Sequence, residues 1–269
     1  MSSIPRFRHT RMHMGDWITP GIRNLVLACT GVFVVQEMLN LFASPRVGGE
    51  VNLWFGLSPW FFVHGLRLWQ PVTYIFLHDP HTLWHLLFNM LFLWMFGVDL
   101  ERAWGKHRFY VYFFVTGIGA ALINVVINIA ADPQGVGSRV AGIPFDSTVP
   151  TIGASGAIYG ILLAAAVMFP DRRIWLIPFP VQIPMKVYVI GAGAIEFFST
   201  LGTGGDNVSH VTHLGGMLIG YLYLRRGSWF FRARNGMSDW KRKRARRKFE
   251  VYMRKHRDEP PSGPDQWVN

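Results

Sequence analysis

Six apolar segments constrain the fold of this chain more than any other feature. They lie at roughly 22–42, 81–98, 108–130, 152–169, 185–201 and 208–224. Each approaches the ~20 apolar residues that an α-helix needs to cross the hydrocarbon core of a bilayer. Half of the 269 residues are hydrophobic and only 16% are charged, which is too apolar for an ordinary soluble domain of this size. We therefore expect an all-α, polytopic membrane protein, a bundle of six transmembrane helices.

The segment between the first two apolar runs is rich in tryptophan and phenylalanine, but it cannot form one continuous spanning helix. It is interrupted by Gly56, Pro59, Gly65, Pro71 and Pro80. Each proline removes a backbone donor and clashes with the preceding helical turn. Because aromatic rings favour the membrane–water interface, we expect the segment to lie there.

The basic residues predict an orientation. If the N-terminus is inside, most Lys and Arg near the span ends are cytoplasmic, and the opposite loops hold only Arg46, Arg67 and Arg139. We therefore expect an integral multi-pass protein of a bacterial cytoplasmic membrane with both termini in the cytoplasm. The expected parts are a cytoplasmic segment at 1–20, a membrane domain at 21–225 and a basic, partly disordered tail at 226–269. The first twenty residues contain no apolar core long enough for a cleavable signal peptide.

A net charge of +11 would also suit a nucleic-acid-binding protein. The basic residues, however, gather at the two ends of the chain and do not interleave with aromatic residues. We expect contact with the lipid bilayer and no nucleic acid. The single cysteine, Cys29, excludes an intrachain disulfide, and the sequence does not define an oligomeric state.

Polar residues inside the apolar runs are the candidates for function, because polar side chains are costly in hydrocarbon. Ser155 and His213 each precede a pair of glycines four residues apart, in GAIYG at 156–160 and GMLIG at 216–220. Such pairs let two helices approach to backbone contact. A serine nucleophile needs a base nitrogen within about 2.6–3.2 Å. His213 faces Ser155 across this seam in our interpretation, although either residue alone could simply mediate helix packing.

Further polar residues share faces with this pair. Tyr159 lies four residues after Ser155, so its ring could stack against His213 or merely pack. No acidic residue is near either site in sequence, so we expect a two-residue dyad and not a triad. His85 and Asn89 are also four residues apart, and their side chains could donate to a developing oxyanion or bridge two helices.

Taken in order, these motifs resemble those of the rhomboid intramembrane serine proteases. The resemblance runs from about residue 69 to 224. It rests on His85-x-x-x-Asn89, Glu101 with Gly105, Gly153-x-Ser155-Gly156 with Tyr159, and His213-x-x-Gly216-x-x-x-Gly220. One departure is Trp69-Gln70, where many rhomboids carry Trp-Arg, and this affects the anchoring of the first loop.

The resemblance implies a role for each matching residue. Ser155 would be the nucleophile and His213 the general base and acid. His85, Asn89 and the Ser155 amide would form the oxyanion hole. Tyr159 would stack on His213, Gly153 would support the site as part of its motif, and Glu101 would join a structural network.

The expected activity is therefore that of an intramembrane serine endopeptidase that cleaves transmembrane protein substrates, without a cofactor or metal. One alternative is a non-proteolytic rhomboid-like protein that binds membrane clients, and another is a channel or scaffold without chemistry. A third is a metal-dependent membrane protein. It would use His78, His81, His85, His210 and His213, although HTLWH at 81–85 lacks the glutamate of HExxH and no intramembrane carboxylate except Glu196 supports this alternative.

Overall fold

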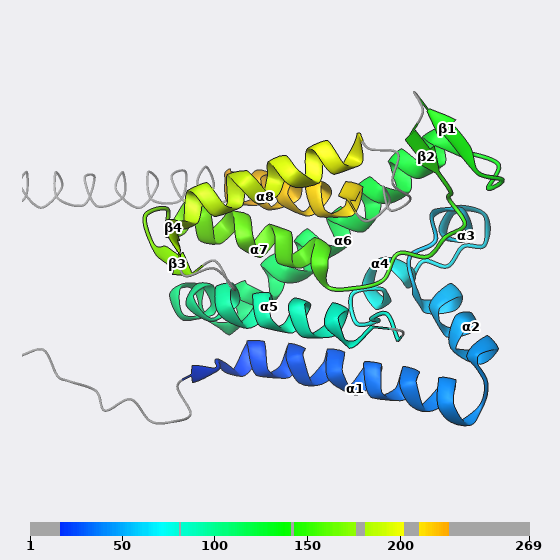
Figure 1. The fold of residues 1–269 in the computed structure, drawn as a ribbon, viewed down its shortest axis with the longest axis horizontal. Coiled ribbons are helices and arrows are strands. Elements are labelled where there is room, and N and C mark those ends of the chain that lie inside the picture. Colours follow the sequence, from blue (N-terminus) through cyan, green and yellow to red (C-terminus); the bar gives the residue numbers. More distant parts are fainter. Residues whose placement is uncertain (1–16, 81, 141–142, 176–180, 202–209, 226–269) are drawn as a thin grey trace, which may run out of the picture. The chain divides into compact units, whose positions relative to one another are not determined.

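The computed structural model of the chain describes residues 17–80, 82–140, 143–175, 181–201 and 210–225 (Figure 1). The chain divides into two compact units, Met1–Tyr223 and Leu224–Asn269, and every labelled element belongs to the first. Most of the expected N-terminal segment and all of the expected basic tail at 226–269 lie outside the described residues.

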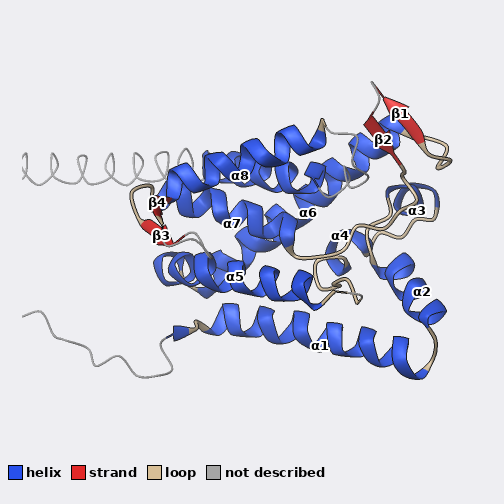
Figure 2. Ribbon diagram, viewed as in Figure 1, coloured by secondary structure: helices blue, strands red, loops and turns tan. Residues whose placement is uncertain are grey.

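Helices make up most of the described chain (Figure 2). A helix over residues 210–225 and five labelled helices match the apolar runs: α1 (Pro20–Phe42), α5 (Leu83–Trp104), α6 (Lys106–Ala131), α7 (Ser155–Met168) and α8 (Met185–Thr200). Among the described residues, α1, α5 and α6 are long and apolar enough to cross a membrane, and α7 is a shorter apolar helix. The helical membrane fold is thus confirmed, while the count of six spans stays a prediction.

The interrupted segment after α1 forms three short helices in place of a span. They are α2 (Pro45–Phe55), α3 (Pro59–His64) and α4 (Gln70–Thr73). Each carries proline at its first or second position, where the missing backbone N–H has no helical partner to lose. The prolines therefore begin helices here, and the prediction that this segment contains no continuous spanning helix is confirmed.

Two small antiparallel hairpins lie in loops between the long helices. One pairs β1 (Ser138–Val140) with β2 (Ile143–Phe145), and the other pairs β3 (Arg173–Trp175) with β4 (Gln182–Pro184). Each strand has three residues, so the sheets leave the helical class of the fold unchanged.

The short helix α7 contacts α5, α6 and α8 (Figure 1). Its glycines allow neighbouring backbones to come close. A Cβ added at Gly216 would lie 1.9 Å from the carbonyl oxygen of Gly156, and one at Gly220 would lie 3.3 Å from the Cα of Gly160. The predicted close approach of the two glycine pairs is therefore confirmed. This contact sets the spacing between α7 and the helix over 210–225.

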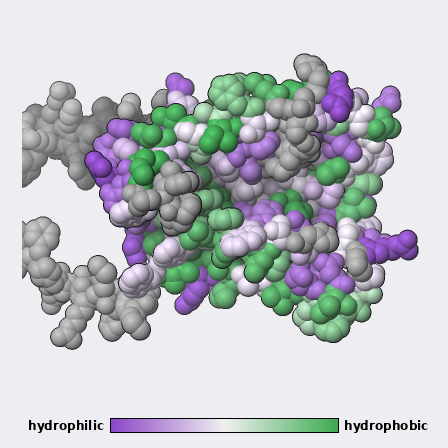
Figure 3. Space-filling view, viewed as in Figure 1, coloured by the Kyte–Doolittle hydropathy of each residue, from purple (hydrophilic) through white to green (hydrophobic). Residues whose placement is uncertain are grey.

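Large hydrophobic side chains are exposed along the outer helices. Leu41 and Phe42 on α1, Val126 on α6, and Ile190 and Phe198 on α8 are each at least two-thirds exposed. Figure 3 shows how much of the visible surface is hydrophobic (green). Apolar surface on this scale would be a liability in water, and it fits contact with lipid.

The first loop is anchored by Gln70 and Arg67. The buried amide of Gln70 accepts from the backbone N–H of Ser58 at 3.2 Å and donates to the carbonyl of Leu53 at 3.1 Å. Arg67 donates to the same carbonyl at 2.8 Å, and its guanidinium lies 4.1 Å from the centre of the Trp54 ring. Gln70, at the position where many rhomboids have arginine, therefore holds the loop through its side-chain amide. Arg67, three residues earlier, donates to the same carbonyl.

Glu101 joins the end of α5 to the start of α1. Its buried carboxylate accepts from the backbone N–H groups of Gly21 at 2.8 Å and Ile22 at 2.9 Å, and from the hydroxyl of Thr19. The first N–H groups of a helix have no intrahelical partner, and a negative charge there also complements the helix dipole. The resemblance implied that Glu101 joins a structural network at the end of its helix, and these hydrogen bonds form such a network. Gly105, with φ +80°, then makes the tight turn into α6.

Candidate active site

Ser155 is the first residue of α7, three residues later than the expected start of the apolar helix at 152. The helix begins late because Gly153 has φ +121°, which an α-helix does not accommodate. The backbone N–H of Gly153 donates to the carbonyl of Tyr74 at 2.9 Å, which fixes this turn against the segment after α4. Ser155 thus stands at a helix N-terminus, where backbone N–H groups favour negative charge.

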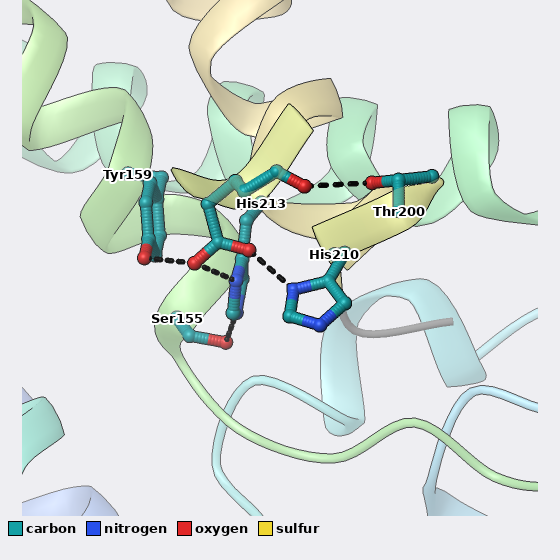
Figure 4. A network of polar contacts seen from close by, with 6 residues as sticks. Ser155, Tyr159, Thr200, His210 and His213 are labelled. Atoms are coloured by element: carbon teal, nitrogen blue, oxygen red, sulfur yellow. Dashed lines mark hydrogen bonds and ion pairs between the residues drawn. The ribbon is translucent and has the colours of Figure 1, made fainter. Parts of the chain in front are cut away.

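The structure brings Ser155, His213 and Tyr159 together (Figure 4). The Oγ of Ser155 lies 2.8 Å from Nε2 of His213, which is hydrogen-bond distance for a nucleophile and its base. The Tyr159 ring stacks on the His213 ring, with centroids 4.3 Å apart and planes 13° apart. The stacking that the spacing allowed and the resemblance implied is therefore present, and all three side chains are half-buried.

Glu196 on α8 is the residue of this site that the sequence prediction missed. Its Oε1 lies 3.1 Å from Nδ1 of His213, an ion-pair distance, although the carboxylate is off the direction of a linear N–H···O hydrogen bond. The Tyr159 hydroxyl donates to the same oxygen, and Nδ1 of His210 lies 2.6 Å from Oε2. No acidic residue lies near Ser155 or His213 in the sequence, as expected, but in the structure Glu196 lies beside His213.

A signal for Glu196 was present in the sequence. A carboxylate inside an apolar run is a functional candidate in its own right, because it is too costly to bury without partners. Glu196 and His213 are 17 positions apart, so no short-range pattern relates them. Their contact forms because α8 and the helix over 210–225 both pack against α7.

Glu196, His210 and His213 also form the one group in the described residues with the composition of a metal site. The 2.6 Å between His210 Nδ1 and Glu196 Oε2 is a hydrogen-bond distance. Two ligands of one tetrahedral zinc, each bonded at ~2.0–2.1 Å, lie ~3.3 Å apart. The contact between these two atoms is therefore shorter than the spacing of two zinc ligands and has the length of a hydrogen bond. His81, the other histidine of the metal alternative on HTLWH, lies outside the described residues.

His85 and Asn89 lie on α5, facing the serine turn. The backbone N–H of Asp79 donates to Nδ1 of His85 at 3.2 Å, which places the ring hydrogen on Nε2. That Nε2 lies 2.8 Å from where a Cβ on Gly153 would be. Asn89 is buried and donates one amide hydrogen to the carbonyl of His85 at 2.8 Å. An amide carries two hydrogens, so a second remains for an oxyanion.

These residues line one groove, of about 1120 Å³. Its walls come from α5, α7, α8, the loop around β1 and β2, and the helix over 210–225. The lining includes His85, Asn89, Ser155, Tyr159 and His213. The serine and histidine therefore face an accessible space with polar and apolar walls, and they are not sealed in the core.

The loop that leads into the serine turn is held by Asp132 at the end of α6. Its carboxylate accepts from the backbone N–H and hydroxyl of Ser147, both at 3.0 Å, and from the backbone N–H groups of Val136 and Gly137. Burial raises the pKa of Asp132, but these hydrogen bonds outweigh it and hold the pKa below its ordinary value. The loop is thus tied to α6 by a charged group.

A second tie joins α6 to the helix that carries His213. The Asn124 amide donates to the Thr212 hydroxyl at 2.7 Å, with both side chains buried. Because Thr212 immediately precedes His213, this bond helps to fix the rotation of the helix over 210–225 against α6.

The helices and the site together define a class: a helical, multi-pass membrane protein with a serine, a histidine and polar donors around one groove. The rhomboid domain family matches residues 65–229. The chain belongs to the rhomboid family.

Named relatives agree with this assignment. The chain is 34% identical to the rhomboid protease AarA of Providencia stuartii over 74% of its own length and 69% of the relative. It is 25% identical to the mitochondrial rhomboid protein 1 of Saccharomyces cerevisiae, over 82% of this chain and 56% of that protein. It is 27% identical to the rhomboid protease GluP of Bacillus subtilis, over 72% of this chain and 33% of that protein. The chain thus spans about half or less of the last two relatives.

Proposed function

We propose that this chain is an intramembrane serine endopeptidase that cleaves transmembrane segments of membrane proteins. The observation that carries the proposal is the 2.8 Å contact between Ser155 Oγ and His213 Nε2 at an accessible groove. Two relatives are named rhomboid proteases, which supports the same activity class.

In the proposed reaction, Ser155 attacks the carbonyl carbon of the scissile peptide while His213 Nε2 takes the hydroxyl proton. His213 then returns that proton to the leaving amine as the C–N bond breaks, which leaves an acyl-enzyme. Water attacks the acyl carbon with His213 again as base, and the serine is released. The oxygen of the tetrahedral intermediate is stabilised by His85 Nε2–H, the second Asn89 hydrogen and the Ser155 N–H.

The substrate has to unwind before it can react. Helical backbone groups are hydrogen-bonded to each other, so a carbonyl within an intact helix is not open to attack. We therefore propose a preference for transmembrane segments with Gly, Pro or polar residues near their outer ends. Replacing those residues with leucine should slow cleavage, and an unchanged rate would contradict this preference.

The chain is an integral membrane protein, and the finer placement is part of the proposal. The bias of basic residues favours both termini in the cytoplasm of a bacterial cell, with a membrane domain at 21–225 and a basic tail at 226–269 near anionic lipid. If binding of the tail to vesicles did not depend on anionic lipid, the proposed attraction of the tail to anionic lipid would be excluded.

The test is a paired cleavage assay on a reporter membrane substrate, with purified wild type and Ser155→Ala, with and without EDTA. A fluorophosphonate should label wild type and not the variant. Cleavage lost in Ser155→Ala and retained in EDTA supports the proposal. Cleavage retained in the variant but lost in EDTA would instead favour a metal-dependent enzyme, and no cleavage by wild type would favour client binding or a scaffold.

A further inference from the structure

Glu196 lies beside His213, at the position that the acidic residue of a Ser-His-Asp triad would occupy. His213 presents Nε2 to Ser155 at 2.8 Å and Nδ1 to Glu196 at 3.1 Å, on opposite sides of one ring. A neutral imidazole that accepts a proton at Nε2 must carry its hydrogen on Nδ1. A carboxylate at Nδ1 selects that tautomer, as the aspartate does in soluble serine proteases.

The carboxylate is itself held in place by two neighbouring side chains. The Tyr159 hydroxyl from α7 donates to Oε1, and His210, one turn before His213, contacts Oε2 at 2.6 Å. The side chain of Glu196 is only 9% exposed, and the hydroxyl of Thr200 bonds to its backbone carbonyl at 2.9 Å. These contacts fix both carboxylate oxygens, so Glu196 meets His213 from one defined position.

The carboxylate of Glu196 can stabilise the positive charge that His213 gains during the proposed reaction. When His213 takes the serine proton, it becomes an imidazolium in a half-buried site, where an unpaired charge is costly. Glu196 offers the opposite charge 3.1 Å away without moving. Such a prearranged charge stabilises the state after proton transfer more than the state before it.

We propose that Glu196 is a positioning residue that makes the Ser155–His213 pair a triad and, through His210 and Tyr159, keeps His213 in its reactive tautomer. This inference rests on the proposed protease function. It assigns no contact between Glu196 and substrate.

The test compares wild type, Glu196→Gln, Glu196→Asp and Glu50→Gln. The Gln variant keeps the shape of the side chain and removes the charge, and the Asp variant keeps the charge on a shorter stem. Glu50 is an exposed glutamate on α2, so its variant controls for the loss of one carboxylate. Steady-state cleavage gives kcat and KM separately, and thermal unfolding in detergent reports the fold.

A second readout is the rate of fluorophosphonate labelling. In that reaction the Ser155 O–P bond forms, the P–F bond breaks and fluoride leaves, while His213 takes the serine proton. The rate thus reports the reactivity of Ser155 without a membrane substrate, and a purely structural role for Glu196 would not change it in a folded variant.

We expect Glu196→Gln to lower kcat and the labelling rate by roughly 10²-fold, less than the ~10⁴-fold seen when a well-aligned triad aspartate becomes asparagine. KM should change little, Glu196→Asp should recover part of kcat, and Glu50→Gln should match wild type. A folded Glu196→Gln variant with kcat and labelling within about threefold of wild type would overturn the inference.

If Glu196→Gln does not fold, Tyr159→Phe takes its place, because it removes only the hydroxyl that holds Glu196 and keeps the stacked ring. Slower labelling by that variant supports the inference, and unchanged labelling overturns it. If wild type does not cleave, or Ser155→Ala cleaves as well as wild type, the protease proposal fails first. Glu196 is then no part of a triad.

Discussion

The carbonyl oxygen of Gly156 occupies the space that a side chain at Gly216 would need. A Cβ at Gly216 would lie 1.9 Å from that oxygen, far inside contact distance. Both glycines border the site, since Gly156 follows Ser155 and Gly216 lies one turn after His213. The distance between Ser155 and His213 is therefore set by two backbones in contact.

Gly216→Ala should push these helices apart. Overpacking a close contact costs about 1–3 kcal/mol, and a backbone neighbour leaves little room for relief. We expect a lower unfolding temperature in detergent and loss of most cleavage. Gly31→Ala is the matched control, because nothing lies within 4 Å of a Cβ there. The control should be neutral or slightly stabilising, since alanine favours helix over glycine by roughly 0.5–1 kcal/mol. Equal stability of both variants would contradict the close backbone contact between Gly156 and Gly216.

Gly153→Ala should impair cleavage beyond its effect on stability. Gly153 has φ +121°, and a Cβ there would lie 2.8 Å from Nε2 of His85. The substitution both strains the backbone and displaces a proposed oxyanion donor, so kcat should fall by about 10²-fold or more. Gly105→Ala separates the two effects, since Gly105 also has a positive φ but nothing lies within 4 Å of its Cβ position. If kcat fell equally in both variants, strain alone would explain the loss.

Much of the site was predictable because its members lie at helical spacings. Ser155 and Tyr159 share a face at four residues, as do His85 and Asn89, and the glycine pairs mark the faces that touch. Hydrophobic length likewise located the long helices, and the prolines excluded a continuous spanning helix between the first two of them. These features are local, so the sequence alone carries them.

Glu196 was not predictable in the same way. Its contact with His213 depends on how α8 and the helix over 210–225 pack against α7, and no short-range pattern encodes that packing. The start of α7 was also misjudged, because the apolar run begins at 152 while the positive φ of Gly153 delays the helix to Ser155. The anchoring of the first loop by Gln70 needed the structure too, since it joins α4 to the carbonyl of Leu53 on α2.

Glu101→Gln should destabilise the protein without changing catalysis by folded molecules. The carboxylate accepts from two backbone N–H groups at the start of α1, and an amide would turn a donor toward at least one of them. Hydrogen bonds to a charged group contribute about 1.5–3 kcal/mol, so we expect a loss of that order in the free energy of unfolding. Asp171→Asn, which breaks an exposed contact with Lys186, should have little effect. A lower kcat per labelled active site would show that Glu101 also acts on the reaction.

Asp132 should make stability depend on pH. Its pKa in the folded protein lies below the ordinary 3.8, because hydrogen bonds from Ser147, Val136 and Gly137 outweigh burial. A depressed pKa contributes stability above the unfolded value, and that stability is lost as pH falls through the folded value. Asp132→Asn should therefore be less stable than wild type at neutral pH, and the difference should shrink as pH falls below about 3.8. Unfolding temperatures at several pH values measure this, and a constant difference would refute it.

Asn89→Ala should slow the chemical step and leave substrate binding nearly unchanged. In the proposed mechanism the second amide hydrogen of Asn89 reaches the oxyanion only after attack, so its loss raises the barrier selectively. Removing one such donor typically lowers kcat by ~10²–10³-fold. Asn52→Ala is the control: it removes an amide that pairs with Gln36 at 2.9 Å, away from the groove, and should cost stability but not kcat. If Asn89→Ala raised KM and left kcat intact, Asn89 would be a binding residue and the oxyanion would depend on His85 and the Ser155 amide alone.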